Sequence, residues 1–321
     1  MTTASVTIHS SQFPENVRRD LLVSLRQRRI NPKFHYDNLK QTLKWLALHE
    51  AHSPARTDRN VLSIYDRAFA ATAKAISAKR LHVIGLGCGG GQKDARLLQL
   101  LKQAGKNLSY TPSDVSVAMT LVARAAAIKV VPAENCFPLV CDLATADDLP
   151  TVLANRRPAL FTFFGMIPNF EPGNILPRLA ALVQKKDYLL FSANLAPGSD
   201  YAAGVKSILP QYDNALTREW LLTFLLDLGI ERTDGRLTFG IEDGAMRLKC
   251  VVAGFHFLRV REIAVHGEKF KFRRGEAIRL FFSYRFTSDR VVQLLARHGL
   301  KVQAEWLAAS GEEGVFLCQR V

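Results

Sequence analysis

The stretch RLHVIGLGCGGGQKDARLLQLLK (residues 80–102) places an apolar run before a glycine-rich turn and an amphipathic segment after it. The apolar run has the pattern of a buried β-strand, and the leucines after the turn recur at helical spacing. The turn contains Gly85, Gly87, Gly89, Gly90 and Gly91. Because a glycine turn before a helix N-terminus exposes backbone N–H groups, the stretch predicts a pocket for a nucleotide-like cofactor.

Alternating helix and strand patterns extend around this turn, from about residue 60 to residue 195. Helices are expected at 59–77, 92–104, 116–128 and 173–184. Strands are expected at 81–87, 108–114, 137–143, 159–165 and 187–195. Strands that alternate with single helices pair in parallel, so the sequence predicts an α/β fold with a doubly wound, mostly parallel sheet.

Two other regions break this alternation and predict an added α+β lobe. Residues 10–59 read as helices, whereas most of the chain from 236 to 286 alternates apolar and polar residues as antiparallel strands do. A final helix and two strands then return to complete the sheet. We therefore expect a sheet domain from residues 60–200 and 286–321, and a lobe from residues 10–59 and 201–285.

The composition is that of a globular protein of 321 residues, of which 48% are hydrophobic. Its five cysteines show no C-x-x-C spacing, which favours a reducing cytoplasm over a disulfide framework or a metal site. No apolar run reaches the roughly 18 residues of a membrane span, and no leader is expected. The net charge of +14 is spread along the chain, with its densest run at KFKFRRG (269–275). Without a basic tail, this charge favours a solvated surface over a nucleic-acid groove.

Two acidic residues follow the expected second and third strands. Asp114 comes 25 residues after Gly89, at the position where doubly wound folds hold ribose hydroxyls with a carboxylate. Asp142 ends the third strand at the same edge, placed to accept a hydrogen bond from an adenine amino group. Dinucleotides and S-adenosylmethionine both fit these residues, and the glycine pattern alone does not separate them.

Several segments carry motifs of one known family. They read INPKFHYD (30–37), HSPARTD (52–58), GLGCGGGQK (85–93), YTPSDVS (110–116), FFGMIPNFEP (163–172), QYD (211–213) and IRLFFSYRF (278–286). The most specific, FFGMIPNFEP, is similar to L-G-S-x-I-G-N-F-x-P. GLGCGGGQK stands where the family has E-L-G-S-G followed by a lysine, so Gly85 replaces an acid. The chain thus resembles the S-adenosylmethionine-dependent methyltransferases that act on the α-amino group of histidine in ergothioneine biosynthesis.

This resemblance implies a class I methyltransferase-type sheet, S-adenosylmethionine as the cofactor, and a lobe that closes over an amino-acid substrate. It places the methionine end of the cofactor beside Gly87, Gly89 and Lys93. The ribose would lie on Asp114, with the adenine near Asp142.

The resemblance also assigns residues to the amino-acid pocket. They are Tyr36, Gly165, Asn169, Tyr212 and Ser283. Asn169 and Tyr212 would hold the substrate carboxylate, and Tyr36 and Asn169 would orient the amine. Methyl transfer to an amine needs desolvation and alignment but no metal.

Three departures from the family indicate a rebuilt acceptor side. Ser53 stands where the family has a tyrosine, and Leu248 where it has a methionine. Phe281 replaces the glutamate that contacts the imidazole of histidine. Because losing one partner of a buried polar pair costs about 1–3 kcal/mol, we expect an acceptor other than histidine, with an apolar or aromatic end.

The sequence therefore predicts an N-methyltransferase for an amino acid or an amino-acid-derived small molecule. Three other functions remain open at this point: transfer of the cofactor's aminocarboxypropyl arm, RNA methylation suggested by the charge, and binding without turnover. Purely structural roles also remain open. Asp114, Asp142 or Asn169 would then cap helices or turns, and Tyr36 or Phe281 would only pack.

Overall fold

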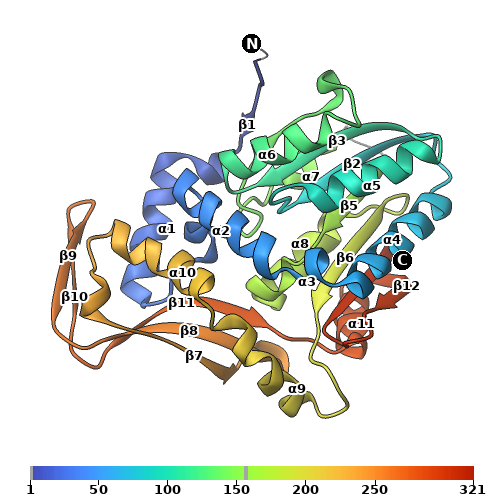
Figure 1. Cartoon of the computed structure of the whole chain (residues 1–321). Coiled ribbons are helices and arrows are strands. Elements are labelled where there is room, and N and C mark those ends of the chain that lie inside the picture. The colour runs from blue at the N-terminus through green and yellow to red at the C-terminus, as the bar shows by residue number, and fades with distance from the viewer. Residues whose placement is uncertain (1–2, 155–157) are drawn as a thin grey trace.

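The computed structural model describes residues 3–154 and 158–321. Its central sheet has eight strands in the order β1-β4-β3-β2-β5-β6-β13-β12 (Figure 1). They are β1 (Thr7–Ile8), β2 (Arg80–Leu86), β3 (Asn107–Asp114), β4 (Leu139–Val140), β5 (Ala159–Phe163), β6 (Tyr188–Asn194), β12 (Leu300–Leu307) and β13 (Glu313–Arg320). The first six pair in parallel, while β13 is antiparallel to both β6 and β12. The predicted doubly wound, mostly parallel sheet is confirmed.

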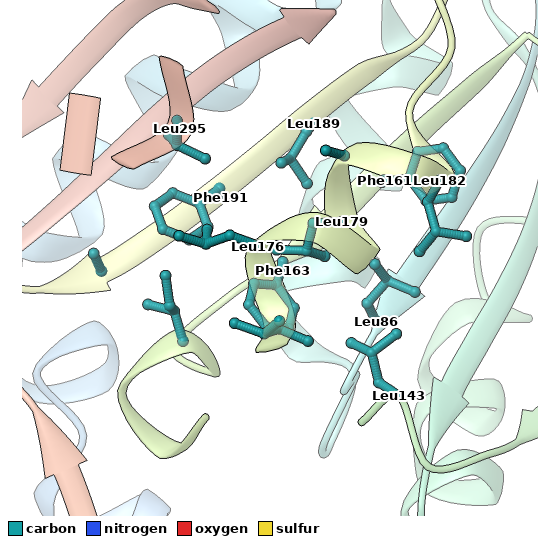
Figure 2. Packing of buried hydrophobic residues seen from close by; sticks show 14 of the residues in the cluster. Leu86, Leu143, Phe161, Phe163, Leu176, Leu179, Leu182, Leu189, Phe191 and Leu295 are labelled. Carbon is teal, nitrogen blue, oxygen red and sulfur yellow. The ribbon is translucent and has the colours of Figure 1, made fainter. Parts of the chain in front are cut away.

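Helices cover both faces of this sheet. They are α4 (Arg59–Ala75), α5 (Gln92–Gln103), α6 (Val117–Ala127), α7 (Leu149–Val152), α8 (Pro172–Leu182) and α11 (Ser288–Arg297). Successive strand residues point to opposite faces, so Val83 packs in the cluster that contains α4 and α5, whereas Ile84 packs in the one that contains α8 and α11. Figure 2 shows the second cluster, where Phe163 and Phe191 of neighbouring strands lie beside Leu176.

Most of a second group of elements lies beside the sheet, at the left and bottom of Figure 1, while its short helix α3 (Pro54–Thr57) lies at the centre of the view. Its other helices are α1 (Pro14–Gln27), α2 (Leu39–His52), α9 (Tyr201–Ile208) and α10 (Ala215–Asp227). Its strands are β7 (Gly235–Asp243), β8 (Lys249–Phe257), β9 (Arg261–Val265), β10 (Glu268–Phe272) and β11 (Ala277–Tyr284). All of their pairings are antiparallel, as expected. The three-stranded sheet has the order β11-β8-β7, and its own core includes Trp220 and Phe255.

One expectation about local structure was wrong. The third strand spans only Leu139–Val140, because Asp142 accepts a hydrogen bond from Ala144 N at 2.9 Å and turns the chain away. The helix α2 falls within the region expected to be helical, and its Leu39 and Leu43 are 64% and 58% exposed. Thr42 is buried instead and bonds to Ser116 of the sheet domain.

Within residues 3–154 and 158–321, no helix is both long and apolar enough to cross a membrane. The same residues hold no group of three or more histidine, cysteine or acidic side chains arranged to bind a metal ion. All five cysteines are free.

Candidate active site

A cavity of about 340 Å³ lies at the carboxyl ends of β2, β3 and β5, where ligands bind in open α/β sheets. Its lining includes residues from both the sheet and the added lobe. The sequence-predicted residues that line it are Tyr36, Ser53, Gly87, Gly89, Lys93, Asp114, Gly165, Asn169, Tyr212, Phe281 and Ser283. The fold thus gathers into one cavity residues that are spread over most of the chain.

Asp114 holds the glycine turn against the end of β3. Its Oδ2 accepts a hydrogen bond from Gly89 N at 3.0 Å, and its Oδ1 accepts one from Ser116 N at 3.1 Å. The N-cap of α6 is Ser116, whose hydroxyl accepts from Met119 N, so Asp114 does not serve as the helix cap. Burial raises the pKa of Asp114 to about 6. Its carboxylate borders the cavity as an acceptor of the kind that ribose hydroxyls require.

The glycine turn leaves no room for side chains. Gly87 and Gly89 have φ values of +63° and +51°, in the region that favours glycine. A Cβ at Gly87 would lie 2.6 Å from the Met166 side chain, and one at Gly89 would lie 3.0 Å from the Trp45 ring. The turn therefore brings bare backbone to the cavity between these two side chains.

Lys93 reaches the cavity through a buried hydrogen-bond network. Its Nζ donates to the Tyr65 hydroxyl at 2.7 Å and lies 3.8 Å from Glu313 Oε1. The Tyr65 hydroxyl also bonds to Glu313 and to Ser192, and Ser192 Oγ accepts from Gly165 N at 2.9 Å. Burial lowers the pKa of Lys93. The network fixes a cation at the wall of the cavity, next to the glycine turn.

Aromatic rings form the opposite wall. The ring of Phe281 lies 5.9 Å from that of Trp220 and 5.9 Å from that of Tyr212. Tyr36 lies 5.4 Å from Trp220, and burial raises the pKa of its hydroxyl, with the charge of nearby Asp114 adding to the effect. Among the described residues, the carboxylates that line the cavity are Asp94, Asp114 and Glu313. They belong to α5 and the ends of β3 and β13, and none belongs to this aromatic wall.

Asn169 contributes a fixed acceptor to this wall. Its Nδ2 donates to the carbonyl oxygen of Phe282 at 2.7 Å. Because that carbonyl only accepts, the contact fixes the orientation of the carboxamide. The Oδ1 of Asn169 is then available for a donor in the cavity.

A chain of donors leads from Arg285 to Ser283. Arg285, only 5% exposed, directs Nε and Nη2 to the Tyr212 hydroxyl at 3.2 and 2.8 Å. With its lone pairs accepting from Arg285, Tyr212 donates its proton to Ser283 Oγ at 2.8 Å. The hydroxyl of Ser283 is left as a donor at the cavity, with a cation behind it.

Two predicted residues lie outside the cavity. Asp142 is buried against Lys33, whose Nζ lies 3.1 Å from its Oδ2, while its neighbours Cys141 and Leu143 line the cavity. Leu248 is fully buried in the core beside α8 and α11. The position of Asp142 at a strand end gave no information about the direction of its side chain.

Several residues of the lining were not predicted from the sequence. They are Trp45, His49, Asp94, Trp220 and Glu313. Trp45 stacks on His49 at 4.7 Å, and burial lowers the pKa of His49 to about 3, which leaves that ring neutral. Only Asp94 had a sequence signal, because Gly85 stands where the family has an acid.

A mostly parallel sheet of this order, with a glycine turn, an acid and a lysine converging at its carboxyl edge, defines a methyltransferase of the class that uses S-adenosylmethionine. The family profile described as histidine-specific, S-adenosylmethionine-dependent methyltransferase matches residues 15–224 and 248–320. The chain belongs to this family, and its cofactor is S-adenosylmethionine. The resemblance seen in the sequence is confirmed.

Similar solved structures include other methyltransferases. The mitomycin 7-O-methyltransferase MmcR is 14% identical, with 97% of this chain and 70% of that chain covered and a TM-score of 0.43. The 1,6-didemethyltoxoflavin-N1-methyltransferase of Burkholderia thailandensis is 13% identical, with coverages of 87% and 90% and a TM-score of 0.40. The CcbJ methyltransferase of Streptomyces caelestis is 14% identical, with coverages of 80% and 96% and a TM-score of 0.40. No curated protein matches the sequence significantly.

The residues at the cavity fit this cofactor. The glycine turn offers close approach to backbone, and Asp114 offers a buried acceptor beside it. Lys93 offers a cation for a carboxylate.

Proposed function

We propose that the protein methylates the amine of an amino acid or an amino-acid-derived small molecule other than histidine. The observation that carries this proposal is the wall formed by Phe281, Trp220 and Tyr212, which holds no carboxylate among the described residues. An imidazole placed there would leave its N–H groups without a charged partner. An apolar or aromatic end would instead contact rings on several sides.

The acceptor needs an amine and a group that accepts hydrogen bonds. We propose that Asn169 Oδ1 accepts a hydrogen bond from the amine N–H, with the carboxamide oriented by its contact with Phe282, and an acceptor of this kind favours nitrogen as the methylated atom. Ser283 presents a donor backed by the charge of Arg285, which suits a carboxylate. Tyr36, Asn169 and Tyr212 are thus the positioning groups of the proposed reaction.

S-adenosylmethionine supplies an electrophilic methyl group on a sulfonium. The residues of this chain bring the amine to it and exclude water. Tyr36 stays protonated at neutral pH because burial raises its pKa, so it orients the amine rather than removing its proton. The rings of Tyr36, Trp45 and Trp220 favour the positive charge that develops on nitrogen as the new bond forms.

The aromatic wall belongs largely to the added elements, which supports residues 10–59 and 201–285 as the substrate-binding lobe. Trp45 and Trp220 lie in α2 and α10, and Phe281 lies in β11. We propose that residues 60–200 and 286–321 hold the cofactor. A small-molecule partner, no nucleic acid and a cytoplasmic location complete the proposal.

The proposal is tested by incubating the purified protein with S-adenosylmethionine and a panel of amino acids and their aromatic amine derivatives. We expect S-adenosylhomocysteine to be released with an aromatic or apolar member, and not with histidine. Release of methylthioadenosine would indicate transfer of the aminocarboxypropyl arm. Histidine as the preferred acceptor, or silence with every amine, would contradict the proposal.

A pair of variants tests the role of Phe281 directly. Phe281→Glu restores a carboxylate facing the acceptor, so we expect measurable methylation of histidine and loss of the native acceptor. Phe281→Leu is the matched control, since it removes the ring without adding charge. Histidine methylation by both variants alike would show that the carboxylate is not the determinant.

A further inference from the structure

Asp94 is a buried carboxylate at the cavity for which the family resemblance provides no role. It lies in the first turn of α5 and is 3% exposed. Its Oδ2 accepts from the Tyr110 hydroxyl at 2.6 Å, and its Oδ1 accepts from Thr162 Oγ1 at 2.7 Å. No lysine, arginine or histidine of the described chain forms an ion pair with it. The groups that contact this anion directly are thus two neutral hydroxyls, and the charge of Lys93 acts on it only from beyond ion-pair distance.

The carboxylate occupies the space in front of Gly85. A Cβ on Gly85 would lie 2.2 Å from Asp94 Oδ2 and 2.9 Å from the Tyr110 hydroxyl. The backbone of Gly85 does not have the positive φ that favours glycine, so a side chain is excluded there by Asp94 and not by conformation. Gly85 also stands where the family sequence has an acid. The negative charge is thus supplied to the same place by the helix instead of the strand.

Burying a carboxylate is costly, and burial raises the pKa of Asp94 even though the hydrogen bonds from Tyr110 and Thr162 and the charge of Lys93 oppose this effect. A ligand that carries a positive charge removes this cost when it binds. S-adenosylmethionine has two such charges, the ammonium of its amino-acid end and the sulfonium. Lys93, the preceding residue, also lines the cavity and presents the opposite charge. Neighbouring cationic and anionic side chains match the two charges of an amino-acid zwitterion.

We propose that Asp94 binds the ammonium group of the cofactor's amino-acid end, while Lys93 binds the carboxylate. The proposal rests on the cofactor of the family and not on the identity of the methyl acceptor. It makes Asp94 a cofactor-binding residue that replaces the family's acid at position 85.

The test compares two ligands that differ only in the amino group, S-adenosylhomocysteine and its des-amino analogue. Their dissociation constants are measured by calorimetry without any acceptor, so the result is independent of the proposed methylation. The unmodified protein should bind the des-amino analogue about thirtyfold more weakly or worse. Asp94→Asn should weaken the binding of S-adenosylhomocysteine by a similar factor. The dissociation constant of the des-amino analogue should change by less than about twofold.

Asp243→Asn is the matched control, since Asp243 is an exposed carboxylate outside the cavity. It should change neither constant. Equal losses for both ligands in Asp94→Asn would show a merely structural role and overturn the proposal. If Asp94→Asn lost affinity for S-adenosylmethionine but not for S-adenosylhomocysteine, Asp94 would be assigned to the sulfonium. That result would also overturn the proposal. Equal affinity of the unmodified protein for the two ligands would overturn it even if every Asp94 variant failed to fold.

A second, independent experiment moves the carboxylate from Asp94 on the helix to position 85 on the strand. Gly85→Asp alone should unfold at lower temperature, because its Cβ meets Asp94. Asp94→Ala should fold but discriminate poorly between the two ligands. In the double variant Gly85→Asp/Asp94→Ala, the ratio of the two dissociation constants should be at least about tenfold larger than in Asp94→Ala. A folded double variant that discriminates no better than Asp94→Ala would contradict the proposal.

Discussion

Lys33 Nζ lies 3.1 Å from Asp142 Oδ2 and 2.5 Å from Asp20 Oδ2, so one buried ammonium joins the N-terminal helices to the end of β4. The Lys33 and Asp142 side chains are 3% and 4% exposed. The sequence-based hypothesis placed Asp142 near the adenine of the cofactor. In the structure its carboxylate contacts Lys33, and this contact links the N-terminal segment to the end of β4.

Asp142→Asn should therefore lower stability more than cofactor affinity. Because Lys33 keeps its contact with Asp20, removing one of its two carboxylates should cost about 1–3 kcal/mol, which should appear as a lower unfolding midpoint in urea. Adenosine affinity, measured by calorimetry on the folded protein, should change less than about twofold. A large loss of adenosine affinity at unchanged stability would restore the adenine role.

The pKa of Asp114 predicts a pH dependence of cofactor binding. Its pKa is raised to about 6, and only the carboxylate accepts hydrogen bonds from both ribose hydroxyls. Affinity for methylthioadenosine, which lacks the amino-acid end, should fall as the pH drops from 7 to 5. The nearby Tyr36 and Cys88 do not titrate in this range because burial raises their pKa values, and His49, with its pKa of about 3, stays neutral.

Asp114→Asn is the control for this profile. It keeps an acceptor for Gly89 N but cannot ionise, so it should bind methylthioadenosine at least about tenfold more weakly and lose most of the dependence on pH between 5 and 7, leaving only the smaller effects of Asp37 and Asp94, whose pKa values are also raised. The stability of the ligand-free protein should change with pH in the opposite direction to the affinity. Because the folded pKa is raised, the contribution of Asp114 to stability is present below its unfolded pKa and is lost as the pH rises through 6. A slope that persists undiminished in Asp114→Asn would assign the titration to another group.

Gly89→Ala should lose cofactor affinity as well as stability. The substitution places a Cβ at a φ of +51° and 3.0 Å from the Trp45 ring. We expect a loss of about 1–2 kcal/mol in the free energy of unfolding, with S-adenosylhomocysteine binding weakened at least about tenfold. Gly105→Ala is the matched control, since Gly105 has a φ of +77° with nothing within 4 Å. It should lose similar stability and keep full affinity.

Arg285→Leu tests the donor chain to Ser283. Without the guanidinium, the Tyr212 hydroxyl no longer has to donate to Ser283, and the positive charge behind the subsite disappears. With an acceptor that carries a carboxylate, KM should rise by about tenfold or more, whereas with its methyl ester KM should change little. The dissociation constant for S-adenosylhomocysteine should stay unchanged. Equal effects on acid and ester would show that the chain only supports the fold.

The sheet and its glycine turn could be predicted because each of their elements has a recognisable pattern in a short stretch of sequence. A buried strand, a glycine turn and a helix with apolar residues at helical spacing each leave a pattern within a few residues, as around Gly87. The strand patterns after residue 286 likewise indicated that the chain returns to the sheet, although they did not identify β6 as the partner of β13. The domain that holds the turn was therefore accessible from sequence.

The features that escaped prediction depend on contacts between distant residues. Nothing near Asp142 indicates that Lys33, 109 residues away, takes its carboxylate. The exposure of Leu43 follows from the burial of Thr42 against Ser116, which no helical pattern encodes. Trp45 and Trp220 enter the cavity only because α2 and α10 pack beside each other.

The hydrogen bond between Tyr65 and Glu313 also has a consequence for the order in which the protein matures on the ribosome. Lys93 reaches its final environment only when β13 has paired with β6 and brought Glu313 to it. The glycine turn and Asp114 emerge long before residue 313 does. The surroundings of Lys93 therefore cannot be complete until translation has passed residue 313, more than 200 residues after the lysine itself has been added.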